Sequence, residues 1–368
     1  MGKLGFRVMD SDLHVIEPRN LWENYLDPKF RGRITTAPEG NQVRAYVDDK
    51  VLPPYADRPE RQRAWSHRLN RPGAERLHRG TIATDALDAM DLEGIDVGIL
   101  FRTWATQAIN IDGLEPTFAA AMSRAWNRWI VDFARENPGR LKPSGLVPLQ
   151  DIDLAVAEAR FAVRDLGAIT LVLPSHPING RAIYDRYYDP LWAVAQEMDV
   201  AVSFHGNHAV YAEHLAKRYL DNLVLGQAVG QPVEMMLTVG AVVTGGVLSR
   251  FPRLRMAFLE GNCSWLPWWL WALDERWEMW GDQELFQQHE KPSELFLRQC
   301  FISVEPEEHL AKHVVAELGD ANLVVSTDWP HDDSRFPKAV DTFLGLPEIG
   351  DESKRKIMWD NCARLYKL

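Results

Sequence analysis

The sequence predicts an α/β fold in which eight parallel strands, each followed by a helix, close into a TIM-like (β/α)8 barrel. Short apolar runs of strand length alternate with helix-length amphipathic segments along most of the chain, which is typical of a parallel sheet covered by helices. Residue types that bind metals or protons gather directly after several of these runs, where barrel enzymes carry their sites. An open doubly wound sheet is the weaker alternative, because no GxGxxG motif follows the first strand.

The eight predicted strands are short and apolar, and helices separate them. The strands lie near residues 5–12, 96–101, 141–146, 168–173, 200–205, 254–260, 300–304 and 322–328. The first predicted helix runs from Thr84, which we expect to cap it, to Leu92. Further helices are predicted over 115–137, from Asp151 or Asp153 to Leu166, in the segment that ends at Met198, and over 232–248, 265–280, 292–298, 309–318 and 351–368.

We expect a single domain over residues 1–368, with one long insertion after the first strand. Residues 19–80 are rich in Arg and Pro and have few periodic apolar positions, so they predict a loop lid over the C-terminal face of the barrel, with a small hairpin at Gln42 to Val51. Its arginines either reach an anionic substrate or form a solvated charged surface. They are Arg58, Arg61, Arg63, Arg68 and Arg71.

Composition excludes several classes of protein. The formal net charge of −11 gives no basic surface for nucleic acid or for an anionic membrane. The three cysteines are far apart and form no CxxC pair, which suits a reducing compartment better than a disulfide framework. No signal peptide and no apolar run of membrane-spanning length is visible, so we expect a cytoplasmic protein whose partner is a small molecule.

Several of the 14 tryptophans fall within Trp265 to Trp280. Charged residues interrupt this segment at helical spacing, which predicts an amphipathic helix that packs on the core or on a subunit interface. A ligand platform is the alternative. A homodimer through this segment agrees with the aromatic enrichment of interfaces, although core packing of a monomer explains it too.

Polar residues that suit a metal or a substrate stand at the ends of five predicted strands. They are Asp12 and His14 after the first, Ser175 and His176 after the fourth, His205, Asn207 and His208 after the fifth, Glu260 after the sixth, and Asp328, Trp329 and His331 after the eighth. An Asp and a His two positions apart on one strand face can bind one metal ion together. Because buried carboxylates are rare unless they are paired or metal-bound, one convergent site explains them best.

Four segments carry a family resemblance. DSDLHVIEP, VSFHGN, RFPRLRMAFLEGNCSWLPWWLWALDE and VSTDWPHDDSRFP resemble, in order and spacing, motifs of the amidohydrolase superfamily. The closer resemblance is to the branch that includes aminocarboxymuconate-semialdehyde decarboxylase, resorcylate-type decarboxylases and carbon–carbon bond hydrolases. It extends from about residue 8 to about residue 360. The resemblance implies a metal-dependent barrel with Asp12, His14, His205 and Asp328 as ligands of one divalent ion, and such mixed N and O ligands suit Zn, Fe or Mn.

This sequence departs from the family pattern at two places. Many relatives have a histidine at the end of strand six, where this chain has Glu260. That carboxylate is a candidate general base, or a ligand that admits a second ion. The first strand carries DxH in place of the commoner HxH, which makes the site more anionic.

Each of the remaining polar residues has a possible functional role and a purely structural alternative. We expect Asp328 to bind the metal and move a proton, rather than only to cap a helix. His331 and His176 are candidate catalytic residues, and His208 is a candidate substrate contact. All three would orient substrate or support the ligands, and the alternative is that they are ordinary polar loop residues. Asn207, Trp329 and Glu17 are candidate substrate contacts, and the alternative for Glu17 is a turn carboxylate before Pro18.

The resulting functional prediction is a metal-dependent hydrolase, in which a metal-activated water attacks a carbonyl of a small organic acid or acyl derivative. The carbonyl belongs to an amide, ester, thioester or activated carbon–carbon bond. The first alternative is a non-oxidative decarboxylase of an aromatic or unsaturated carboxylic acid. The second is an inactive barrel that serves as a binding protein. A serine or cysteine nucleophile is disfavoured, because no GxSxG motif is present and Cys263 has no evident activating partner.

Overall fold

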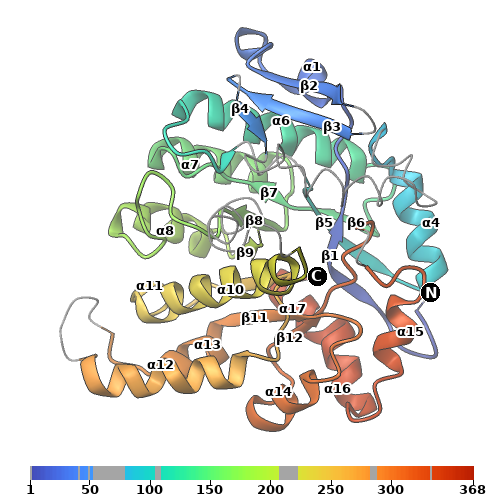
Figure 1. Ribbon diagram of the computed structural model, residues 1–368, viewed down its shortest axis with the longest axis vertical. Helices are drawn as coiled ribbons and strands as arrows, with labels where there is room; N and C mark the ends of the chain where they lie inside the picture. Colours follow the sequence, from blue (N-terminus) through green and yellow to red (C-terminus); the bar gives the residue numbers. More distant parts are fainter. Residues whose placement is uncertain are drawn as a thin grey trace.

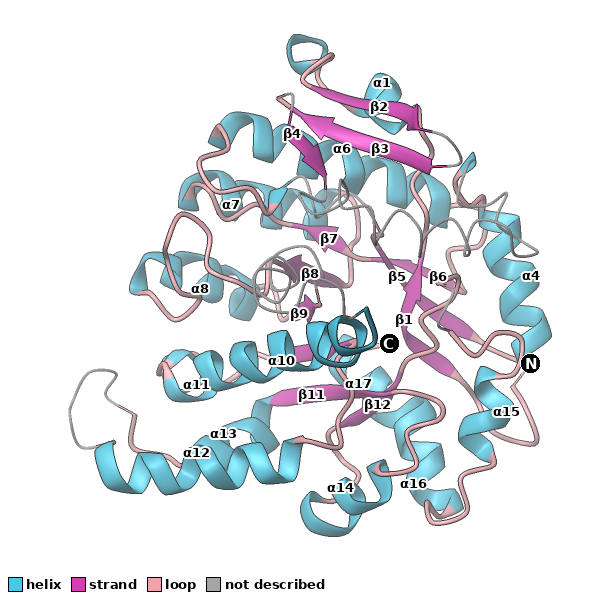
Figure 2. Ribbon diagram, in the orientation of Figure 1, coloured by secondary structure: helices cyan, strands magenta, loops and turns pink. Residues whose placement is uncertain are grey.

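A ring of parallel strands forms the centre of the molecule. The computed structural model describes residues 2–39, 42–48, 50–52, 79–103, 109–206, 223–281, 288–331 and 334–368. Neighbouring strands pair in parallel and in chain order, with β6 and β7 as two halves of one strand position. They are β1 (Met9–His14), β5 (Val97–Phe101), β6 (Leu141–Pro143), β7 (Gly145–Leu146), β8 (Thr170–Leu173), β9 (Ala201–His205), β10 (Met256–Leu259), β11 (Cys300–Val304) and β12 (Leu323–Val325) (Figure 2).

Side chains close the ring at its two seams. Ser144 lies between β6 and β7, and its Oγ donates to the Leu100 carbonyl of β5 at 2.6 Å. At the other seam the Ser11 Oγ of β1 donates to the Val325 carbonyl of β12 at 2.6 Å. The Asp10 carboxylate also accepts from the Thr327 N–H at 3.1 Å and from the Thr327 hydroxyl. The predicted α/β fold is therefore present, and first and last strands lie side by side.

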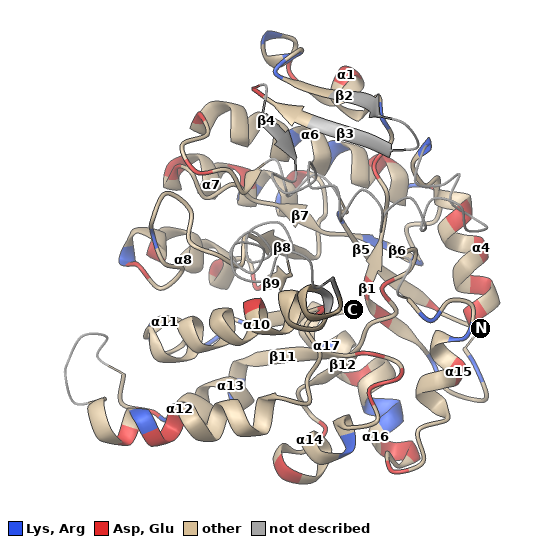
Figure 3. Cartoon of the chain, in the orientation of Figure 1, with Lys and Arg blue, Asp and Glu red and all other residues tan. Residues whose placement is uncertain are grey.

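Helices cover the outside of the strands (Figure 1). The longer ones are α4 (Ala83–Glu93), α6 (Pro116–Ala134), α7 (Ile152–Arg160), α8 (Asp189–Glu197), α10 (Leu223–Thr244), α12 (Leu266–Trp280), α13 (Pro292–Gln299) and α14 (Ala311–Leu318). Shorter ones are η2 (Phe161–Asp165), η3 (Arg186–Tyr188), α11 (Val247–Arg250) and α15 (Ala339–Leu344). The predicted C-terminal helix is confirmed as α16 (Asp351–Arg355), η4 (Lys356–Asp360) and α17 (Asn361–Tyr366). Charged residues lie mainly on these outer elements (Figure 3), and the strands of the ring carry few of them, namely Asp10 and Asp12 on β1 and Lys142 on β6.

The first strand begins later than the sequence pattern predicts. β1 covers residues 9–14 rather than 5–12. Leu4 and Gly5 have positive φ values of 51° and 88°, and Lys3 pairs with Phe6 in an isolated bridge. This tight turn prevents an extended strand at residue 5, so Asp12 and His14 lie inside the strand and not after it.

Two helix predictions are wrong at their N-termini. Thr84 does not cap α4, because the helix already begins at Ala83 and the Asp85 carboxylate accepts from the Ile82 N–H at 3.0 Å. The helix predicted from Pro232 begins at Leu223 instead, with Pro232 inside it. Proline is favoured at the first turn of a helix, which suggested a start there. In the interior it removes one backbone hydrogen bond, and α10 continues through it.

The segment between β1 and α4 is described only in part. It contains α1 (Leu21–Tyr25), η1 (Pro28–Phe30) and an antiparallel sheet of β2 (Ile34–Glu39), β3 (Gln42–Val47) and β4 (Lys50–Leu52). The predicted hairpin is thus confirmed as β3 and β4. The five arginines singled out between residues 58 and 71 lie outside the described residues.

The tryptophan-rich helix α12 has a buried stripe and an open face. Leu266 and Leu270 are buried, whereas Trp268 and Trp271 are more than half exposed in the isolated chain. Trp269 is half-buried, and its indole N–H donates to the Met236 carbonyl of α10 at 2.8 Å. The amphipathic helix is therefore confirmed. In the part of the chain that the structure describes, no helix has the length and apolarity needed to cross a bilayer.

Candidate metal centre

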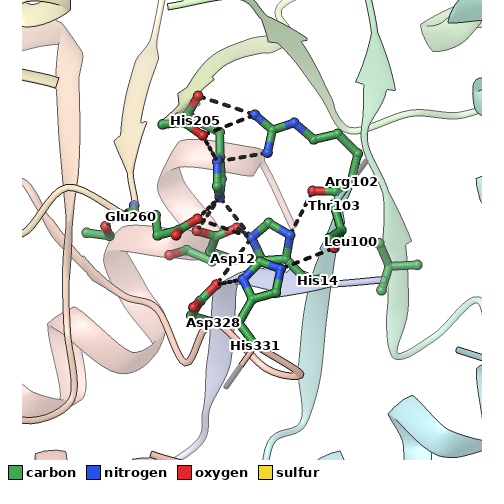
Figure 4. A network of polar contacts seen from close by, with 12 residues as sticks. Asp12, His14, Leu100, Arg102, Thr103, His205, Glu260, Asp328 and His331 are labelled. Atoms are coloured by element: carbon green, nitrogen blue, oxygen red, sulfur yellow. Dashed lines mark hydrogen bonds and ion pairs between the residues drawn. The ribbon is translucent and has the colours of Figure 1, made fainter. Parts of the chain in front are cut away.

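Side chains from four strand positions meet at one point inside the C-terminal end of the ring. The His14 Nε2 atom lies 3.3 Å from Asp12 Oδ1, 2.8 Å from His205 Nε2 and 3.4 Å from Asp328 Oδ1. The Glu260 Oε2 atom lies 2.7 Å from His205 Nε2 and 3.6 Å from His14 Nε2. Figure 4 shows these five side chains turned toward one another. Two overlapping groups of four have the spacing that a metal ion requires, namely Asp12, His14, His205 and Glu260, and His14, Glu260, Asp328 and His331.

An irregularity in β1 separates the two acidic residues of the first motif. The register of β1 against β5 shifts between Asp10 and Leu13. Asp10 accepts from the Thr327 N–H and hydroxyl and from the Asp12 N–H, so it fastens the seam between β1 and β12. Burial raises the pKa of Asp10 to about 6, although these hydrogen bonds act in the opposite direction. Of these two carboxylates, Asp12 is the one that faces the candidate metal centre.

Glu260 and Asp328 reach the centre from left-handed backbone. Their φ values are +52° and +55°, a region that costs a residue with a side chain about 1–3 kcal/mol and that often marks functional sites. Glu260 directly follows β10, and Asp328 lies three residues after the end of β12, where the chain has turned into a loop. The Ser303 Oγ accepts from the Glu260 N–H at 2.9 Å, and the Gln231 amide donates to Glu260 Oε1. The strained turn after β10 is therefore held from two sides.

Asp328 is joined to a chain of polar groups. The His331 Nδ1 lies 2.6 Å from Asp328 Oδ1, and His331 Nε2 lies 3.2 Å from the Thr103 hydroxyl. The His331 ring also lies against the His14 ring, with 4.2 Å between their centroids. The structure therefore brings His331 to the centre, as the prediction of a catalytic role requires.

The donor set fits a divalent cation. Asp12 is fully buried, yet neither of its carboxylate oxygens has a hydrogen-bond partner. Burial by itself would raise the pKa of Asp12, but the His205 and His14 imidazoles outweigh it and lower the pKa well below its ordinary value. Burial would lower the pKa of His14, but the carboxylates around it, Asp12 first, raise it well above its ordinary value. Three carboxylates around two imidazoles thus favour a positive charge at their centre.

Arg102 and Thr103 are site residues that the sequence analysis missed. Arg102 follows β5 directly and is 4 % exposed. Its Nη1 lies 2.9 Å from His205 Nδ1, and its Nη2 donates to the His205 carbonyl at 3.3 Å. Burial lowers the pKa of the Arg102 guanidinium, but Glu260, Asp12 and Glu17 act against this. Thr103 donates its hydroxyl to the Val15 carbonyl at 2.9 Å and also contacts His331.

Glu305 is a further missed carboxyl group, at the end of β11. One of its oxygens is buried without a partner. Burial, and then repulsion from Asp328, Glu308 and Glu260, raise the pKa of Glu305 well above its ordinary value. The same strand-end rule that found the other ligands, applied to strands two and seven, identifies Arg102, Thr103 and Glu305.

Other predicted residues lie away from the clustered atoms. The Glu17 carboxylate accepts from the Thr103 N–H at 3.2 Å and from the Trp126 indole at 3.1 Å. The Trp329 side chain is buried against Phe336, and its carbonyl accepts from the His14 N–H at 2.7 Å. His176 belongs to neither group of four. Asn207 and His208 lie outside the described residues.

Comparison with curated proteins gives decarboxylases as relatives. The chain is 24 % identical over 288 residues to a gamma-resorcylate decarboxylase of Polaromonas sp., covering 76 % of this chain and 85 % of that protein. It is 24 % identical over 244 residues to a 2-amino-3-carboxymuconate-6-semialdehyde decarboxylase of Dictyostelium discoideum, covering 66 % of this chain and 64 % of that protein.

Solved structures share the fold. An amidohydrolase from Mycobacterium avium subsp. paratuberculosis has a TM-score of 0.79 at 23 % identity, over 99 % of this chain and 100 % of that chain. A dihydroxybenzoic acid decarboxylase from Polaromonas sp., solved with manganese and 2-nitroresorcinol, has a TM-score of 0.73 at 19 % identity, over 99 % of this chain and 97 % of that chain. These likenesses confirm the predicted α/β fold of the amidohydrolase barrels.

The family model described as amidohydrolase matches residues 22–368. That match begins after Asp12 and His14, whose place in the centre rests on the geometry above. The chain therefore belongs to the amidohydrolase family and, as its motifs indicated, to the branch related to aminocarboxymuconate-semialdehyde decarboxylase.

Proposed function

We propose that this protein is a metal-dependent, non-oxidative decarboxylase of an aromatic or unsaturated carboxylic acid. The observation that carries the proposal is the clustering of Asp12, His205 and Asp328 around His14 Nε2, within two overlapping groups of possible ligands that share His14 and Glu260. The curated relatives of the chain are decarboxylases. From the sequence alone, hydrolysis was the first prediction and decarboxylation the first alternative, and the proposal exchanges the two. The revision rests on the comparisons, because the ligand set alone serves both reactions.

The proposed cofactor is one divalent ion, and manganese is the first choice because the related dihydroxybenzoic acid decarboxylase was solved with it. Asp12, His14, His205 and Asp328 would hold the ion, with Glu260 as a fifth ligand or as the link to a second ion. A divalent ion held there supplies positive charge that orients a substrate carboxylate and stabilises negative charge on a neighbouring oxygen. Carboxylate and imidazole donors without thiolate suit Mn, Fe or Zn.

The reaction itself needs one proton and no water. The bond between the carboxylate carbon and the ring or alkene carbon breaks, carbon dioxide leaves, and the electron pair remains on that carbon, which then takes a proton. Asp328 and His331, in contact at 2.6 Å, are the proposed pair that holds and moves this proton. Glu305 is a second proposed source, because burial raises the pKa of this carboxyl group well above its ordinary value.

Hydrolysis is the second candidate, and the contact of Asp328 with His331 favours it equally, since a carboxylate and imidazole pair can also take a proton from water. The inactive-barrel alternative loses support from the intact ligand set, because a barrel that had lost its chemistry would not need a fully buried carboxylate such as Asp12 facing two imidazoles.

The test is to incubate the Mn²⁺-loaded protein in D2O with 2,6-dihydroxybenzoate, 5-carboxyvanillate and a panel of aryl esters and amides. Release of carbon dioxide with deuterium on the former carboxyl-bearing carbon supports decarboxylation. Uptake of ¹⁸O from labelled water into a product acid, without carbon dioxide, would replace it with hydrolysis. An Asp328→Asn protein is the control for contaminating activity.

Several sequence-based expectations remain proposals. We propose one domain over residues 1–368, with the 19–80 segment as a lid over the C-terminal face of the barrel. We also propose that Glu17, Asn207, His208 and Trp329 contribute to substrate binding, that the protein acts on a small molecule in the cytoplasm, and that α12 contributes to a homodimer. Limited proteolysis with and without substrate tests the lid, and sedimentation equilibrium tests the oligomeric state.

A further inference from the structure

A second group of buried polar side chains lies on the same face of the barrel and shares no residue with the metal centre. Asn110 is in the loop after β5, Gln150 is in the loop after β7, and His176 is in the loop after β8. All three loops leave the C-terminal ends of their strands, the end at which the metal centre lies. Asn110 and Gln150 are each 8 % exposed.

These side chains converge on one short segment of backbone. The Gln150 amide N–H group donates to the carbonyl of Ile109 and lies 3.4 Å from the carbonyl of Ile111, so it holds the chain on both sides of Asn110. His176 Nε2 lies 3.4 Å from the Asn110 carbonyl. The group is therefore fixed in place by its own contacts and does not consist of loose surface residues.

The remaining polar atoms of these three side chains have no hydrogen-bond partner. They are both amide atoms of Asn110, the Oε1 of Gln150 and the Nδ1 of His176. Buried polar atoms in folded proteins are almost always hydrogen-bonded, so four unpartnered atoms on three neighbouring side chains require an explanation. Removing each from water without a partner costs free energy that a bound ligand can restore.

The chemistry of these atoms selects the ligand. The Gln150 amide nitrogen is committed to backbone carbonyls, which leaves its oxygen as an acceptor. Burial lowers the pKa of His176, which favours the neutral ring. The Nε2 atom faces the Asn110 carbonyl, so in the neutral ring Nδ1 is an acceptor as well. Asn110 can present either its oxygen or its nitrogen. Among the described residues no Lys or Arg side chain donates to these atoms. Two fixed acceptors therefore favour a hydroxyl or amine and repel a carboxylate.

We propose that Asn110, Gln150 and His176 form a subsite for an uncharged, hydrogen-bond-donating substituent of the substrate, of the phenolic hydroxyl or amino class, while the carboxylate is held at the metal centre. The inference rests on the proposed function for the position of the carboxylate. It gives His176 a binding role in place of the catalytic one that the sequence suggested.

The experiment compares ligands that differ by one hydroxyl. Salicylate and the four dihydroxybenzoates that add one hydroxyl to it are titrated calorimetrically into the Mn²⁺-loaded and the metal-free protein. One isomer is expected to bind the loaded protein about tenfold more tightly than salicylate, the gain from one good hydrogen bond. In Asn110→Leu and in His176→Phe this ratio is expected to fall to about one. The exposed Asn24→Leu is the matched control and keeps the ratio of the wild type.

The ratio, rather than the absolute affinity, is the readout, so a general loss of affinity does not imitate the expected result. Asn110 has no side-chain partner, so its replacement by leucine should not lower the thermal midpoint. If every isomer binds like salicylate, or if the ratio persists in both variants, the subsite is refuted. If salicylate binds equally with and without Mn²⁺, the proposed function fails instead, and the two failures are thereby distinguished.

Discussion

Glu234 on α10 offers a sharp test of the electrostatics of this fold. Its side chain is 4 % exposed, and its Oε1 accepts from the Ser175 hydroxyl at 3.1 Å. Burial raises the pKa of Glu234 from 4.5 to about 7, although the hydrogen bond from Ser175 acts in the opposite direction. The folded protein therefore binds this proton more tightly than the unfolded chain does. The perturbation is Glu234→Gln, which removes the titration and keeps an oxygen that can accept from Ser175.

The sign and size follow from the two pKa values. A raised carboxyl pKa contributes stability that is fully present below pH 4.5 and is lost as the pH rises from 4.5 through 7. The difference of 7 − 4.5 = 2.5, at about 1.4 kcal/mol for each pKa unit, corresponds to about 3 kcal/mol. Relative to wild type, Glu234→Gln should therefore gain about 3 kcal/mol of unfolding free energy between pH 4.5 and pH 8.

The assay is urea unfolding of both proteins at several pH values from 4.5 to 8, in the presence of a chelator so that bound metal does not contribute. Glu317→Gln is the control, because Glu317 is exposed and should show no such dependence. A difference between Glu234→Gln and wild type that is the same at both ends of this pH range would refute the reasoning.

Three further predictions concern the metal centre and the segment beside it. Asp328→Asn should lower kcat by at least about 10²-fold with an unchanged circular dichroism spectrum, and full turnover at full metal content would contradict its catalytic role. Mn²⁺ at about 100 times its Kd should raise the unfolding free energy by about 2.7 kcal/mol, a chelator should reverse this, and an unchanged thermal midpoint would argue against binding. Gly80→Ala should cost about 1–3 kcal/mol in denaturant unfolding, because Gly80 has a φ of +83° and its Cβ would lie 2.8 Å from the Pro18 backbone. Gly350→Ala, with nothing within 4 Å, is the control and should change stability by less than about 0.5 kcal/mol.

The strands could be predicted from the sequence because a barrel strand is buried on both faces and is therefore a nearly continuous apolar run, unlike the amphipathic helices around it. This is why β11 was predicted at its observed bounds, Cys300–Val304. The pattern failed at residues 5–8, where a local turn with positive φ at Leu4 and Gly5 outweighs the apolar composition. It also failed at the start of α10, because Pro232 is compatible with both the first turn and the interior of a helix.

The site was predicted in part for a similar reason. Parallel strands bring their C-terminal ends together, so residues far apart in sequence, such as Asp12 and Asp328, could be expected to meet. The orphaned groups Asn110 and Gln150 could not be found in this way. Their significance depends on which partners they lack, and that is a property of neighbouring loops rather than of any local pattern.

By itself, the sequence determined the alternation of strands and helices and the chemical types at most strand ends, since both follow from local periodicity and side-chain chemistry. Only the tertiary structure determined which ionisable side chains lie close enough to interact and which do not. The shifted register of β1 sends Asp10 to Thr327 and Asp12 to the metal centre. The tertiary structure also places Arg102 against His205. Burial and distance set the strength of an electrostatic interaction, and neither can be derived from the local sequence.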